Sequence, residues 1–272
     1  MKKFSICILV ALLVVGIWAF PKIKALNTTY HLFDEDQIVE NFRSVKEIWP
    51  TRQLNKAAKP YRYAQGERLS LPLTFSSDGT SFDTAAFLED SWTTGLLVIQ
   101  ADEIRLENYY RGNTESTQNI SWSMAKSFIS ALVGIAVSEG YITSIEDPVE
   151  VYAPELIGSG YEGVSIKDVL QMSTGVGFNE DYGDFYSDIN RWGRDFSLGN
   201  SQDAFAGTLE REVEPGTLNH YVSINTHVLG MIVTRATGRT ITDYMQEKLY
   251  EPLGMEYSGY WEVDGTGMEM AL

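Results

Sequence analysis

The chain has 272 residues, of which 44% are apolar, 12% aromatic and 21% charged, and this composition is typical of a globular protein. At about 150 residues per domain, the length predicts one or two domains with a sizeable core. The formal charge of -16 is spread along the sequence and repels phosphate backbones, which argues against nucleic acid as a partner. One cysteine cannot form an internal disulfide, and three histidines do not favour a zinc site.

The amino terminus is typical of a membrane-targeting segment. Met1-Lys2-Lys3 is a basic start, and an uncharged apolar run follows from Phe4 to Phe20. As a helix this run reaches about 25 Å, slightly short of a hydrocarbon core of about 30 Å. It is either a cleaved signal peptide or an uncleaved anchor; the lack of a clear cleavage site and the presence of Lys22 and Lys24 favour the anchor. In both cases we expect residues 1–26 to export the rest of the chain, which is then anchored facing outward or secreted.

Two further segments precede the helical part of the chain. Residues 27–70 are polar and irregular, which predicts a tether that packs on a main domain at residues 71–272. Two β-rich runs, Trp92 to Gln100 and Ile104 to Arg111, flank a short polar break and predict a β-hairpin.

The first long helix is expected from Ile120 to Glu139, before Gly140. Its residues are apolar on almost every side, which predicts a helix buried at the centre of the domain. A second helix begins at Ser165, where Asp168 completes a capping box.

The stretch from Phe178 to Asn200 is rich in Asp, Tyr and Gly and predicts a long surface loop. Apolar residues from Ile224 to Ile232 recur at helical spacing, and Gly238 ends that helix. Thr240 and Asp243 cap a last helix, which stops before Pro252. A hairpin followed by helices predicts an α+β fold in which the helices are segregated from an antiparallel sheet.

The strongest chemical signal is Ser123-Met124-Ala125-Lys126, at the start of the apolar helix. Residues three apart share a helix face, so the Lys126 amine can reach the Ser123 hydroxyl. A lysine in apolar surroundings has a lowered pKa and can act as a base toward a serine nucleophile. The positive end of the helix dipole favours the oxyanion that forms on attack. Because S-x-x-K also occurs by chance in many helices, this motif needs support from elsewhere in the chain.

Tyr221-Val222-Ser223 is the second signal, and it lies just before a predicted helix. A tyrosine phenol can shuttle a proton when a nearby cation lowers its pKa, and Ser223 adds a hydroxyl for the lysine or the substrate. Taken alone, Tyr221 is more typical of an ordinary aromatic at a helix start. No G-x-S-x-G motif occurs, and none of the histidines is placed as a triad base, so a Ser-His-Asp mechanism is not favoured.

These residues resemble the penicillin-recognising serine hydrolases, which include class C β-lactamases, D,D-peptidases and related esterases. The chain is most similar to the 6-aminohexanoate-dimer hydrolase-like branch, from about Leu71 to Leu272. Five blocks in order carry the resemblance: SWSMAKSF at 121–128, GYITSIEDPVEVYAPEL at 140–156, LQMSTGVGFNEDYGD at 170–184, YVSINTHVLG at 221–230 and EPLGME at 251–256.

The resemblance implies an antiparallel sheet flanked by helices beside an all-helical lobe, with the active site between them. It implies that Ser123 is acylated, that Lys126 is the activating base and that Tyr221 passes a proton to the leaving group. The backbone N–H of Ser123 would supply half of the oxyanion hole, and Tyr182 matches a substrate-contacting tyrosine. Ser223 stands where β-lactamases carry asparagine, which favours an esterase or amidase.

One departure from the family pattern concerns the carboxy-terminal part. The family has a third motif, Lys/His/Trp-x-Gly, on a strand after the tyrosine helix, and no such strand is expected before Leu272. We therefore expect a carboxy-terminally truncated, weakly folded and nearly inactive form.

The prediction from sequence is thus a membrane-tethered or exported serine hydrolase that cleaves esters or small amides. It needs no cofactor, because an acyl-enzyme route uses only protein groups. The alternatives are a penicillin-binding or D,D-peptidase-type protein and a non-catalytic binding module on the same fold. The natural substrate and the oligomeric state are not fixed by the sequence.

Overall fold

The computed structural model describes residues 2–271, without the side chains of residues 2–12 and 14. Its α-helices are α1 (Lys2–Tyr30), α2 (Ile38–Arg43), α3 (Thr84–Asp90), α4 (Ala125–Ser138), α5 (Ile166–Leu170), α6 (Asp188–Ser197), α7 (Gln202–Ala206), α8 (Ile224–Thr237) and α9 (Ile241–Met245). Its strands are β1 (Thr51–Leu54), β2 (Ala64–Gln65), β3 (Thr74–Ser77), β4 (Thr80–Asp83), β5 (Gly95–Gln100), β6 (Glu103–Tyr109) and β7 (Gly259–Glu262). Short 3-10 turns are η1 (Val45–Glu47), η2 (Trp122–Met124), η3 (Val149–Val151) and η4 (Pro154–Leu156), and η5 (Gln246–Tyr250) is a π-helical turn after α9.

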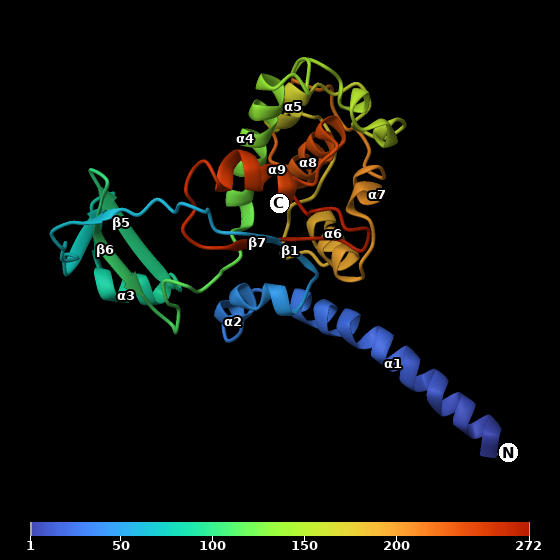
Figure 1. Cartoon of the computed structure of the whole chain (residues 1–272), viewed down its shortest axis with the longest axis horizontal. Coiled ribbons are helices and arrows are strands. Elements are labelled where there is room, and N and C mark those ends of the chain that lie inside the picture. The colour runs from blue at the N-terminus through green and yellow to red at the C-terminus, as the bar shows by residue number, and fades with distance from the viewer. Residues whose placement is uncertain (1, 272) are drawn as a thin grey trace.

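The helix α1 contains the apolar run expected to enter a membrane. Most of that run, residues 4–12 and 14, lies outside the described side chains. Among the residues whose side chains are described, no helix has both the length and the apolar character that a membrane span requires. In Figure 1, α1 extends away from the rest of the chain toward the amino terminus.

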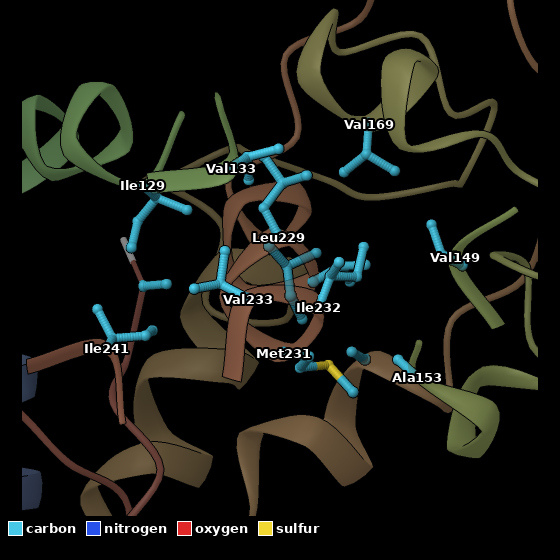
Figure 2. Packing of buried hydrophobic residues seen from close by; sticks show 14 of the residues in the cluster. Ile129, Val133, Val149, Ala153, Val169, Leu229, Met231, Ile232, Val233 and Ile241 are labelled. Atoms are coloured by element: carbon cyan, nitrogen blue, oxygen red, sulfur yellow. The ribbon is translucent and has the colours of Figure 1, made fainter. Parts of the chain in front are cut away.

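A helical lobe forms the main core, and α8 is its central element. Every residue from Ile224 to Val233 is buried, and α8 packs against α4, α5 and α7. Figure 2 shows Leu229, Ile232 and Val233 of α8 lying among apolar side chains from the surrounding elements. Burying this continuous apolar surface is the main stabilising contribution to the lobe.

The prediction that the helix near residues 120–139 is buried on all sides is wrong. α4 buries one face, made of Ala125, Ile129, Leu132, Val133 and Ala136, and exposes much of the opposite face. The physical reason is that the β5–β6 hairpin does not cover α4: Figure 1 shows the hairpin and α3 standing apart from the helical lobe. An apolar helix can therefore keep a solvent-exposed side when its second packing partner lies elsewhere.

The expected hairpin is confirmed as β5 and β6, which pair antiparallel from Gly95↔Tyr109 to Gln100↔Glu103 with an irregularity at Val98/Ile99. β2 adds to β6 in parallel, so the sheet order is β2-β6-β5. β3 and β4 form a separate antiparallel pair. These small sheets beside a helical lobe confirm the α+β class.

The segment expected to be an irregular tether contains more regular structure than its composition indicates. Within it, β1 pairs antiparallel with β7, about two hundred residues further along the chain, from Thr51↔Glu262 to Leu54↔Gly259. Arg52 of β1 also forms an ion pair with the buried carboxylate of Glu269. The segment is thus fixed to the main lobe by a sheet and a salt bridge.

The predicted helix caps at Ser165 and Thr240 are confirmed, since each side chain accepts a hydrogen bond from the backbone N–H three residues later. The expected end of α8 is also confirmed, because Gly238 adopts a left-handed conformation with φ of 66°. The predicted surface loop at 178–200 is partly wrong. Ser187 caps α6 inside it, and Ile189, Trp192 and Phe196 recur at helical spacing on the buried face of α6.

Candidate active site

Ser123 lies in the short turn η2, directly before α4. The preceding residue, Trp122, has a φ of 48°, a left-handed conformation that is uncommon outside glycine. This sharp turn presents the Ser123 side chain at the surface at the amino end of α4. The free N–H groups and the positive dipole end of a helix stabilise negative charge at such a position.

Lys126 follows one turn later on the same face of α4. Its Nζ donates a hydrogen bond of 3.1 Å to the Ser123 Oγ. Burial lowers the pKa of Lys126 from its ordinary value, while the nearby Tyr221 and the charge of Glu180 partly oppose this effect. A lowered pKa increases the fraction of neutral amine, which is the form that can accept a proton from the serine hydroxyl.

Tyr221 reaches Ser123 from a different part of the chain. Its hydroxyl donates to the Ser123 Oγ over 2.9 Å, and the Lys126 Nζ lies 5.5 Å from the centre of its ring. The next two residues, Val222 and Ser223, are buried at the start of α8 and fix the backbone there. The three residues predicted from the two sequence motifs are therefore brought together around one oxygen atom.

Ser223 and Tyr182, the two predicted substrate-binding residues, lie beside these three. The backbone N–H of Ser223 donates to the Glu180 carboxylate. Burial and the charge of Glu180 raise the pKa of Tyr182, whose side chain keeps about half of its surface exposed (54%). The loop that carries Glu180 and Tyr182 is held to α6, because the Asn190 side-chain amide donates to the Tyr182 carbonyl over 3.0 Å.

Glu180 is a site residue that the sequence reasoning missed. It lies in the acidic stretch before α6, where its negative charge acts on both Lys126 and Tyr182. Its position two residues before Tyr182 was the signal available in the sequence, but many neighbouring acidic residues in this stretch gave the same signal.

Other candidate groups lie away from Ser123. The buried His227 pairs with Asp203 over 2.8 Å between α8 and α7, a structural contact. No cluster of three potential metal ligands occurs within the described part of the chain. A cavity of about 570 Å³ includes Trp122 and Ala125 in its lining but not Ser123, Lys126 or Tyr221.

Comparison with known proteins places this fold and geometry in a family. Residues 85–265 match the Beta-lactamase family, so the chain belongs to this family of hydrolases. The resemblance indicated by the five sequence blocks is thereby confirmed.

Individual relatives agree with this membership. The chain is 32% identical over 191 residues to the 6-aminohexanoate-dimer hydrolase of Paenarthrobacter ureafaciens, covering 68% of this chain and 48% of that protein. It is 25% identical over 145 residues to a beta-lactamase of Yersinia enterocolitica, covering 53% of this chain and 34% of that protein. The solved structure of a candidate 6-aminohexanoate-dimer hydrolase from Bacillus anthracis has a TM-score of 0.76 at 18% identity, covering 88% of this chain and 65% of that one.

The chain spans about half or less of the length of these curated relatives, and less than two thirds of the Bacillus anthracis protein. The structural similarity at this level of identity shows a shared fold.

Proposed function

We propose that the protein is a serine hydrolase that cleaves ester or small amide bonds through an acyl-enzyme on Ser123. The observation that carries the proposal is the convergence on one hydroxyl: the Ser123 Oγ contacts both the Lys126 amine and the Tyr221 phenol. A nucleophile, a base within hydrogen-bond reach and a second proton carrier are the groups that acyl transfer requires.

In the proposed reaction, neutral Lys126 takes the proton from Ser123 as its Oγ attacks the substrate carbonyl. The backbone N–H of Ser123, at the positive end of α4, stabilises the resulting oxyanion. Tyr221 then passes a proton to the leaving alcohol or amine as the bond to the carbonyl carbon breaks. Water hydrolyses the acyl-enzyme by the same groups in reverse, which restores the serine.

One relative supports a small amide as the substrate. The Paenarthrobacter relative is named for hydrolysis of a 6-aminohexanoate dimer, a short linear amide. The Glu180 carboxylate beside Ser223 and Lys126 opposes a substrate carboxylate at this position. Because the 6-aminohexanoate dimer itself ends in a carboxylate, this charge bears only on where such a group can lie. Ser223, in place of the asparagine that β-lactamases carry, favours an esterase or amidase over a β-lactamase.

The test is turnover of 4-nitrophenyl esters and of the corresponding anilides by the whole chain and by Ser123→Ala. Ser130→Ala, which removes an exposed hydroxyl from the same helix, is the matched control. Turnover that is lost with Ser123→Ala and kept with Ser130→Ala supports the proposal; turnover that survives Ser123→Ala contradicts it. Since we expect this chain to turn over substrate only slowly, covalent acylation of Ser123 is measured in parallel by intact mass.

Penicillin labelling separates the alternative functions. Stable labelling of Ser123 by benzylpenicillin without ester turnover favours a penicillin-binding protein. A chain that neither labels nor turns over favours a non-catalytic binding module.

We also propose that residues 1–26 export or anchor the chain. The basic start and the apolar run from Phe4 to Phe20 support this proposal. Fractionation of cells that express the whole chain or a variant without residues 1–26 tests it, and equal distribution of the two forms would contradict it.

A further inference from the structure

Four aromatic side chains form a continuous cluster that includes Trp122, the residue before Ser123. We call this cluster the aromatic wall: Phe33, Phe42, Trp122 and Tyr182. Phe33 stacks on Trp122 with ring centres 5.4 Å apart and meets Tyr182 edge-on at 6.0 Å. Phe42 makes edge-to-face contacts with Phe33 and Trp122, with ring centres 5.9 and 5.2 Å apart. The distances and angles are those of favourable aromatic pairs.

The wall connects the two sides of the candidate active site. Trp122 is the residue directly before Ser123. Tyr182 lies near Tyr221 and Glu180, whose charges help to raise its pKa. Phe33 contacts both rings, so it lies between Trp122, which precedes the candidate nucleophile, and Tyr182, which belongs to the acidic loop. Neither sequence motif contains Phe33, which comes from the segment expected to be a tether.

The part of the chain that carries Phe33 and Phe42 is held in place by backbone contacts. The Ile120 N–H donates to the Phe42 carbonyl over 2.9 Å, immediately before the turn that presents Ser123. The Asn41 side-chain amide donates to the His31 carbonyl over 2.8 Å and closes the loop around Phe33. Val45 and Trp49 are then buried in a small core with Phe196. The wall is therefore held in place beside the turn that carries Ser123.

The wall also offers apolar surface to a ligand. Phe33 keeps 50% of its surface exposed and Tyr182 keeps 54%. Covering this apolar surface with a ligand would be favourable in free energy. The faces of the phenylalanine rings carry no hydrogen-bonding atoms, so an apolar group is the chemical partner that they fit. The negative charge of Glu180 acts on Tyr182 at one end of the wall and disfavours an anionic group there.

We infer that the aromatic wall binds an apolar acyl or aryl group of the substrate, and that Phe33 is a specificity-determining residue. The inference rests on the proposed function and names its substrate class: esters or amides whose acyl part is a medium-length alkyl chain or an aromatic ring. Such a group leaves water when it lies on the exposed faces of Phe33 and Tyr182 while its carbonyl carbon is within reach of Ser123.

The first test compares kcat/KM for 4-nitrophenyl acetate and 4-nitrophenyl hexanoate. We expect the unmodified chain to prefer the hexanoate about tenfold, because the added methylenes are partly buried on the wall. Phe33→Ala should remove most of this preference by lowering kcat/KM for the hexanoate more than for the acetate, and Phe33→Leu should restore part of it. Phe87→Ala, at an exposed phenylalanine on α3, is the matched control.

A merely structural role for Phe33 gives a different pattern. In that case Phe33→Ala lowers kcat/KM for both esters equally, or leaves the preference unchanged, and the inference is overturned while the proposed function stands.

A binding measurement keeps the inference testable without turnover. The dissociation constant of 4-nitrophenyl hexanoate is measured with Ser123→Ala and with the double variant Ser123→Ala/Phe33→Ala. About fivefold or greater weakening in the double variant supports the wall, even if the proposed catalysis fails. Equal dissociation constants, or no binding to Ser123→Ala, overturn it.

Discussion

Replacing Lys126 with methionine separates the catalytic role of its amine from its contribution to the fold. Methionine retains an unbranched apolar side chain of similar length but cannot accept a proton. The Lys126 Nζ is 3.1 Å from the Ser123 Oγ, so proton transfer between them is direct. Loss of a positioned general base costs about 10²–10⁴-fold in rate, or roughly 3–5 kcal/mol. Because Tyr221 also contacts the serine hydroxyl, we expect the lower half of this range.

Lys126→Met should lower activity without lowering the stability of the fold. Burial lowers the pKa of Lys126 below its ordinary value of 10.5. Between the lowered pKa and 10.5, the unfolded chain binds more protons than the folded chain, so the free energy of unfolding rises with pH. At neutral pH the folded protein carries a charge that burial disfavours, and Lys126→Met removes it. The variant should therefore be at least as stable as the unmodified chain, and should lack this pH-dependent rise.

The assay combines ester turnover with urea unfolding at pH 7 and at higher pH. Lys167→Met is the control, because Lys167 is a surface lysine of α5 that forms an ion pair with Glu146. A variant at Lys126 that loses activity and stability together would refute the reasoning, since a lysine whose loss unfolds the protein is a structural group. Unchanged turnover would refute the role of the amine.

Three further predictions follow from the same geometry. Tyr221→Phe should lower kcat about a hundredfold without loss of stability, because the tyrosine is 47% exposed and contributes its hydroxyl to Ser123; equal turnover by the variant contradicts the proton-shuttle role. Glu180→Gln retains an acceptor for the Ser223 N–H but removes a negative charge that partly offsets the lowering of the Lys126 pKa by burial. The Lys126 pKa should therefore fall further, and the acidic limb of the kcat/KM–pH profile should move to lower pH. A shift to higher pH, or no shift, contradicts this electrostatic role. Ile232→Ala removes a fully buried side chain from the centre of α8 and should lower the free energy of unfolding by about 2–5 kcal/mol in urea denaturation; a loss below about 1 kcal/mol would show that α8 is not the centre of the core.

Local signals in the sequence predicted much of the secondary structure. The caps at Ser165 and Thr240, the stop at Gly238 and the β5–β6 hairpin depend on a few neighbouring residues, and all four were confirmed. The candidate pair of Ser123 and Lys126 was also visible, because residues three apart share a helix face. That Tyr221 joins this pair came from the family resemblance, since about a hundred residues separate it from Ser123.

Features that depend on distant contacts were not predictable in the same way. The pairing of β1 with β7 joins chain segments about two hundred residues apart, and neither strand has a strong pattern of its own. Which faces of α4 are buried depends on the elements that pack against it, and these cannot be predicted from the sequence of α4 alone. Phe33 and Glu180 become site residues only through packing, because Phe33 meets Trp122 and Tyr182, and Glu180 accepts the Ser223 N–H.

The most direct test of the central claim is the intact mass of the protein after exposure to a fluorophosphonate, with Ser123→Ala as the control. The geometry predicts a single adduct on Ser123, because the Lys126 amine and the Tyr221 phenol both contact its hydroxyl. The control should remain unlabelled. No adduct, or equal labelling of Ser123→Ala, would contradict the proposal that this serine is an activated nucleophile.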